Sequence, residues 1–156
     1  MTGILGSKFE ASLRILLLLG AAQEIALTEG EIVALDYITV YAHDFGLAES
    51  NLHGSGKYRF GEFTSRRPTI STAIRQLVLD GLVVVLRSSG GFQYKLGSDG
   101  LDFALSLETE YADTYYETAT QVIAGIGTSQ HTLGNLINRK SIASIREDQS
   151  YGDLLP

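Results

Sequence analysis

The stretch from Arg59 to Leu96 constrains the fold more than any other part of the chain, because its hydrophobic period changes from helical to alternating along its length. In its first part, apolar residues recur at the spacing of one buried helix face. These residues are Ile70, Ala73, Ile74 and Leu77. Pro68 suits the first turn of such a helix and Gly81 suits a left-handed C-terminal cap. We therefore predict a helix from Pro68 to Asp80.

The second part of the stretch has the pattern of a β-hairpin. Residues 82–87 (LVVVLR) are rich in β-branched side chains, and residues 92–96 (FQYKL) alternate between apolar and polar. Between them lie two serines and two glycines, and glycine reaches the positive φ of a tight turn at little cost. With a preceding helix from Arg59 to Arg66, this order predicts a winged helix-turn-helix in which the hairpin is the wing.

The N-terminal part is predicted to be helical. A first helix is expected from about Lys8 to Ala22, with Ser7 as its cap. Thr28 followed by Glu31 is a capping-box pattern, which predicts a second helix over residues 29–45. Residues 46–56 are rich in glycine and serine and contain Asn51, and we expect a loop there.

Helices are also predicted after the hairpin. Ser98 suits the cap of a long helix over residues 99–124, and a last amphipathic segment is expected over residues 128–146. The fold class is therefore mainly α with a small β-hairpin. We divide the chain into a winged helix-turn-helix domain with N-terminal helices, residues 1–97, and a C-terminal helical extension, residues 98–156. The extension has more apolar surface than a small winged helix needs, so we expect it to form an interface.

Composition excludes several classes of protein. The chain has 156 residues and no cysteine, which excludes disulfides, thiolate metal sites and cysteine nucleophiles. The apolar run of residues 15–19 is too short to span a membrane, since about 18 apolar residues would be needed. The N-terminus lacks the pattern of a secretory signal, so we expect the cytoplasm as the location and no membrane partner.

Charge is distributed unevenly along the chain. The net charge is −6, yet the segment from Lys57 to Lys95 has seven basic and two acidic residues and a net charge of +5. A basic winged helix between acidic flanks is compatible with DNA binding by this segment alone.

Two sets of side chains are candidates for DNA or partner contact. The outer face of the predicted helix from Pro68 to Asp80 would enter a major groove. It carries Thr69, Ser71, Thr72, Arg75 and Gln76. Basic residues around it would contact phosphates or a protein partner. These are Arg59, Arg66, Arg67, Arg87 and Lys95. The alternative is that both sets form the solvated face of a winged helix that binds protein.

No motif in the chain indicates catalysis. His43 and Asp44 are adjacent and would point in different directions on a helix, and a structural role is expected for them and for His53. The glycine-containing segments lack the lysine and the strand-to-helix context of a phosphate-binding loop. We therefore expect a protein that is not an enzyme, with no catalytic residues, no metal and no cofactor.

Three segments together resemble a known family. They are ALDYITVYAHDFGL (residues 34–47), NLHGSGKYRFGEFTSRR (residues 51–67) and AIRQLVLDGLV (residues 73–83). They resemble the middle components of bacterial ABC three-component conflict systems and the related small subunit of Lamassu anti-phage systems. The residues that match are His53, Tyr58, Arg59, Glu62, Phe63, Arg66 and Arg67.

The resemblance implies a non-catalytic adaptor. Its winged helix would pack on an SMC/Rad50-like ABC ATPase, much as kleisin winged helices pack on SMC heads, and would link that ATPase to an effector protein. DNA would then be sensed by the ATPase, and contact between this chain and DNA stays open. The alternative function is a dimeric winged-helix transcriptional repressor whose C-terminal helix forms the dimer contact.

Overall fold

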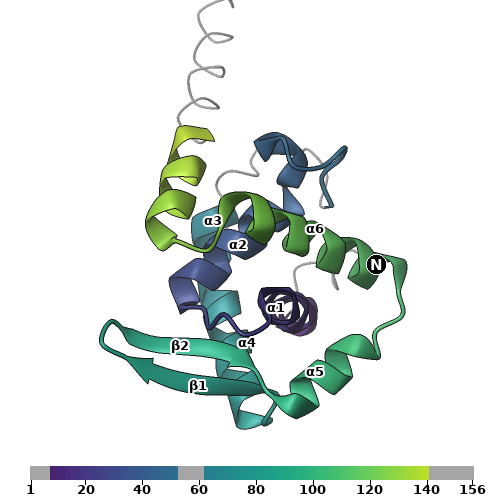
Figure 1. The fold of residues 1–156 in the computed structure, drawn as a ribbon, viewed down its shortest axis with the longest axis vertical. Coiled ribbons are helices and arrows are strands. Elements are labelled where there is room, and N and C mark those ends of the chain that lie inside the picture. The colour runs from purple at the N-terminus through teal and green to yellow at the C-terminus, as the bar shows by residue number, and fades with distance from the viewer. Residues whose placement is uncertain (1–7, 53–61, 141–156) are drawn as a thin grey trace, which may run out of the picture.

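The computed structural model describes residues 8–52 and 62–140. They form a mainly helical, winged-helix-like fold with one small antiparallel hairpin (Figure 1). Helix α1 (Lys8–Ala22) lies at the centre, seen nearly end-on in Figure 1, and four other helices pack against it. These are α2 (Glu29–Val40), α4 (Arg67–Leu79), α5 (Ser98–Leu105) and α6 (Glu110–Ile126).

Helix α1 explains the apolar run in the sequence. All five residues from Ile15 to Leu19 are buried, because neighbouring helices cover α1 on several sides. No helix in the described part of the chain is both long enough and apolar enough to cross a lipid bilayer.

Helix α2 begins as its sequence predicts. The Thr28 hydroxyl accepts a hydrogen bond from the Glu31 amide (3.1 Å), and the Glu31 carboxylate accepts one from the Thr28 amide (2.9 Å). This reciprocal capping box satisfies two amides that the helix leaves free. The α-helix ends at Val40, and a 3-10 turn (η1, Ala42–Phe45) continues it to Gly46, whose φ is +74°.

The segment around α4 also follows the prediction. A short helix α3 (Glu62–Ser65) precedes α4, Gly81 has a φ of +77°, and β1 (Val83–Ser88) pairs antiparallel with β2 (Gly91–Leu96). The predicted start, at Arg59, of the helix that precedes α4 lies outside the described residues. The predicted cap Ser7 of α1 and the predicted end of the last helix also lie outside them.

The single long helix predicted over residues 99–124 is wrong. Helix α5 ends at Leu105, and α6 begins at Glu110 with the Thr109 hydroxyl accepting a hydrogen bond from the Ala112 amide (3.1 Å). The break lets α5 and α6 pack on different sides of α1 (Figure 1). Ser98 is also not the cap of α5: Gly97 holds that position, and no side chain caps the helix.

Residues on both sides of the predicted boundary at residue 97 share one hydrophobic core. Tyr115, Ala119 and Val122 of α6 are fully buried against the N-terminal helices. Leu133 and Ile137, from a further helical segment at residues 130–140, belong to the same core. The division into two domains stays a prediction.

Candidate partner interface

A charged cluster inside the core fixes the start of α4. Its centre is Asp36 of α2, which is 1% exposed and accepts hydrogen bonds from Arg14 Nε (2.9 Å) and Tyr115 Oη (2.8 Å). A guanidinium nitrogen of Arg66 lies 3.5 Å from the other Asp36 oxygen. Glu10 accepts hydrogen bonds from Arg14 and Tyr111, both at 2.9 Å. The Asp36 cluster therefore joins α1, α2, α6 and the residue before α4.

Opposing effects set the ionisation of the Asp36 cluster. Burial raises the pKa of a carboxyl group, but the nearby guanidiniums of Arg14 and Arg66 outweigh burial and lower the pKa of Asp36. Burial disfavours charge on Arg14 too, yet Asp36 raises its pKa above the ordinary value. Burial, reinforced by Asp36, raises the pKa of Tyr115. The cluster thus holds charged Asp36 and Arg14 beside a neutral phenol.

The two adjacent arginines before α4 have different surroundings. The Arg66 side chain is 17% exposed, and its guanidinium carbon lies 5.9 Å from the centre of the Tyr41 ring. The Arg67 side chain is 54% exposed, with Nε 4.0 Å from a Glu29 oxygen. Of these two predicted contact residues, Arg67 therefore lies at the surface and Arg66 faces the core.

The outer face of α4 carries the predicted polar set. The Thr72 hydroxyl donates to the Pro68 carbonyl (2.9 Å), and the Gln76 amide donates to Asp80 (3.0 Å). Thr69 and Ser71 are half-buried, and Arg75 is exposed. Within residues 8–52 and 62–140, no ion pair or hydrogen bond engages the Arg75 guanidinium.

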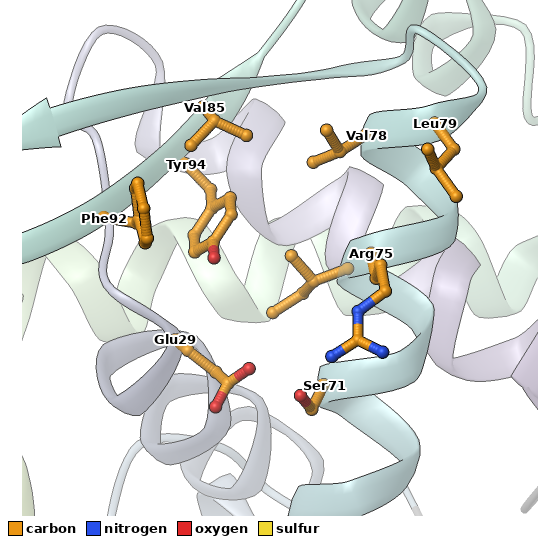
Figure 2. Close-up of a pocket in the computed structure, with 9 residues that line it drawn as sticks. Glu29, Ser71, Arg75, Val78, Leu79, Val85, Phe92 and Tyr94 are labelled. Carbon is orange, nitrogen blue, oxygen red and sulfur yellow. The ribbon is translucent and has the colours of Figure 1, made fainter.

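A pocket of about 290 Å³ opens between α4, the hairpin and the start of α2. We call it the α4–hairpin pocket. Its walls are mainly apolar, and Figure 2 shows side chains of α4 facing those of β1 and β2 across it, with Glu29 at one end. The lining residues are Glu29, Ser71, Ile74, Arg75, Val78, Leu79, Val85, Phe92 and Tyr94.

Large apolar side chains surround this pocket at the surface. Leu79 is 74%, Phe92 55% and Val85 39% exposed, whereas Val84 and Leu86, which are about 40% exposed, alternate with Val85 and lie on the other face of the hairpin. Contiguous apolar surface of this kind marks interaction sites on soluble proteins. The α4 face and the hairpin together therefore form a candidate docking surface.

The predicted basic residues do not all lie at the docking surface. Arg87 lies over the Phe92 ring, 5.9 Å from its centre, and so borders the docking surface with Arg67 and Arg75. Lys95 alternates with the pocket residues Phe92 and Tyr94, and its ammonium donates to Glu24 (2.9 Å). Lys95 is therefore paired away from the pocket. Arg59 lies outside the described residues.

The family of the chain follows from comparison with known proteins. A family model described as ABC-three component (ABC-3C) system Middle Component 2 matches residues 4–147, which is most of the chain. The chain belongs to this family. Comparison with curated proteins and with solved structures gave no match.

In this middle component, residues that carried the resemblance have structural contacts. Phe63 packs edge-on against Tyr37, with ring centres 5.5 Å apart, and Arg66 reaches Asp36 and Tyr41. These contacts seat α3 and the start of α4 on α2. His53, Tyr58 and Arg59 lie outside the described residues, and the side chain of Glu62 is likewise not described.

Sequence reasoning did not identify several residues of the middle component's pocket and core. Glu29, Leu79 and Phe92 carry no local signal, since their pocket is formed by three separate elements. The Asp36 cluster had a weak signal in the sequence. Asp36 interrupts an apolar helix, and Glu10 and Arg14 have the spacing of an i, i+4 ion pair. In the described part of the chain, no group of three metal-ligating side chains comes together.

Proposed function

We propose that this middle component is a non-catalytic adaptor that links an SMC-like ABC ATPase to an effector protein in a cytoplasmic anti-phage defence complex. Membership of a middle-component family supports the proposal, because a component of a three-component system has partners within that system. The single observation that carries it is the docking surface of α4 and the hairpin, where exposed apolar residues lie beside Arg67, Arg75 and Arg87.

The chemistry of this surface favours a protein partner over DNA. Phosphates and base edges are bound by charged and polar side chains, and a DNA-binding wing would present those groups. Here Val85 of β1 and Phe92 of β2 are exposed beside the pocket. Burying such side chains against an apolar protein surface is favourable, because it removes apolar area from water. The charged phosphates of DNA provide no apolar surface to bury them against.

The proposal is tested by coexpressing the middle component with its two system partners and purifying through a tag on the ATPase. Arg75→Glu should reduce the copurified middle component, because the arginine is exposed at the docking surface. Arg139→Glu is the matched control, with the same charge change at another exposed helical position. If Arg139→Glu lost copurification with the ATPase and Arg75→Glu retained it fully, the interface would lie on the C-terminal helices instead.

Wild-type protein that fails to copurify with either partner would contradict the adaptor proposal. A gel shift with duplex DNA at moderate salt separates it from the repressor alternative, because sequence-specific binding by the isolated chain would favour a repressor. Arg66 is unsuitable for this test, since Arg66→Glu would place a carboxylate beside buried Asp36 and disturb folding.

A further inference from the structure

The backbone of β1 is unpaired on its outer side. The amide and carbonyl of Tyr94 in β2 bond to Leu27, at 2.7 and 2.9 Å, and so point away from β1. Val85 is directly opposite Tyr94. Two opposite residues in an antiparallel pair either exchange backbone hydrogen bonds with each other, or both direct their amide and carbonyl away from the partner strand. The amide and carbonyl of Val85 therefore point away from β2, and those of Arg87, two residues along, do the same.

The described residues provide no partner for this edge. The sheet consists of β1 and β2, and no backbone hydrogen bond outside the hairpin engages Val85 or Arg87 in the described ranges. In Figure 1 the hairpin extends away from the helices, with β1 on its outer side. An exposed apolar edge strand is a template for pairing with another chain.

The edge lies beside the α4–hairpin pocket. The Val85 side chain lines this pocket with Phe92 and Tyr94, and Val78 and Leu79 of α4 face them (Figure 2). A strand added along β1 would direct every second side chain toward the pocket, since side chains alternate along a strand. Peptide-binding domains that use strand addition gain affinity from backbone hydrogen bonds and specificity from such pockets.

We infer that β1 binds an extended segment of another component of the three-component system by strand addition. The segment carries apolar side chains at alternate positions, which enter the α4–hairpin pocket, and an acidic side chain that meets Arg75. This inference rests on the proposed adaptor function and specifies how one partner is held.

Charge complementarity selects this occupant. Arg67, Arg75 and Arg87 border the surface, while Glu29 is 4.0 Å from Arg67, so the unpaired charge at the pocket is positive. A second copy of this chain fits poorly, because its own edge from Val83 to Ser88 contains Arg87 and no acidic residue. Duplex DNA cannot supply the backbone amides and carbonyls that a strand edge requires.

Amide hydrogen exchange, resolved by NMR on the isolated chain and on the purified complex, tests the pairing directly. In the complex, the amide of Arg87 and that of Val85 should exchange at least about tenfold more slowly, because each gains a hydrogen bond or is covered. Val84 and Leu86 are internal controls, since their amides already face β2 and should change little. Unchanged exchange at Val85 and Arg87 in a stable complex would overturn the inference and leave the adaptor proposal intact.

A pair of substitutions tests the same point through binding. Val85→Pro removes the outward amide, and Val85→Ala keeps the amide while shortening the apolar side chain. Edge strands tolerate proline where the amide faces solvent, and circular dichroism of each variant checks folding. We expect Val85→Pro to weaken partner binding about tenfold more than Val85→Ala. Equal losses would indicate side-chain docking without strand addition and would overturn the inference.

Two further outcomes are decisive. An isolated wild-type chain that is dimeric by light scattering, and monomeric as Val85→Pro, would show that a second copy occupies the edge and would overturn the inference. If the wild-type chain forms no complex with either component, the adaptor proposal fails and the inference fails with it.

Discussion

Asp36 brings two guanidinium groups and a phenol together inside the core of the middle component. A buried charge costs much free energy unless it is paired and hydrogen-bonded, and removing one partner leaves the others uncompensated. Asp36 accepts from Arg14 and Tyr115 and also faces Arg66, so a single side chain couples α1, α6 and the start of α4 to α2. Its loss should therefore affect the whole fold.

Asp36→Asn should lower the free energy of unfolding by about 3–5 kcal/mol, because Arg14 and Arg66 would each lose a buried ionic partner. Urea denaturation followed by circular dichroism measures the change. Asp102→Asn, at an exposed position of α5, is the control and should change stability by less than about 0.5 kcal/mol. Equal stability of the two variants would contradict a structural role for the Asp36 cluster.

Acid should weaken the fold through the same residue. The pKa of Asp36 in the folded chain lies below its ordinary value of 3.8, so the folded state holds this proton less tightly than the unfolded state. Its stabilisation is complete above the unfolded pKa and is lost as pH falls through the lower folded pKa. We expect the free energy of unfolding to drop below about pH 3.8, and less steeply in Asp36→Asn, in urea titrations at a series of pH values. Parallel pH profiles would assign the acid sensitivity to other carboxyl groups.

At the scale of elements, the turn before β1 and helix α5 meet at one carbonyl. The Leu82 carbonyl accepts a hydrogen bond from the Gly97 amide (3.0 Å), and a Cβ at Gly100 would collide with the same oxygen. Helix α5 can therefore approach the base of the hairpin because residue 100 has no side chain. This close approach places α5 against the base of the hairpin.

Gly100→Ala should lower the free energy of unfolding by about 1–3 kcal/mol, although alanine is the better helix former, because backbone must move to admit the methyl group. Gly134→Ala is the matched helical control, since its methyl group would meet nothing within 4 Å. That control should be neutral or stabilising by up to about 1 kcal/mol. Thermal unfolding of both variants measures the difference, and a stabilised Gly100→Ala would refute the close approach.

Across the whole molecule, the N-terminal and C-terminal helices form one hydrophobic core. Helix α6 lies along α1 and α2, with Tyr115, Ala119 and Val122 buried between them. Leu133 and Ile137 add to the same core. Without the C-terminal helices, the apolar residues of α1 and α2 would face water on the side that α6 covers.

A fragment of residues 1–97 should therefore lack a cooperative thermal transition, while the full chain unfolds in one step. The physical reason is the loss of apolar burial along α1 and α2, at about 25 cal/mol per Å². Differential scanning calorimetry of both proteins makes the comparison. A sharp transition in the fragment would instead support the predicted boundary at residue 97.

Local interactions made much of the fold predictable from the sequence. The capping box of α2, the helix from residue 67 to 79 and the hairpin were all indicated by spacings of two to four residues, because those interactions occur within one element. The predicted helix over residues 99–124 failed since its apolar spacing continues through a break that Thr109 caps. The break is decided by packing of α5 and α6 on α1, which periodicity does not report.

The sequence alone determined the mainly helical class, the order of helix and hairpin, and the resemblance that the family match confirms. Tertiary structure alone decided that Arg66 faces Asp36, that Lys95 pairs with Glu24, and that the outer edge of β1 lies beside an apolar pocket. The physical reason is the separation along the chain of the residues that interact. Helices and turns depend on neighbours along the chain, whereas these pairings join residues that only the packing of distant elements brings within contact.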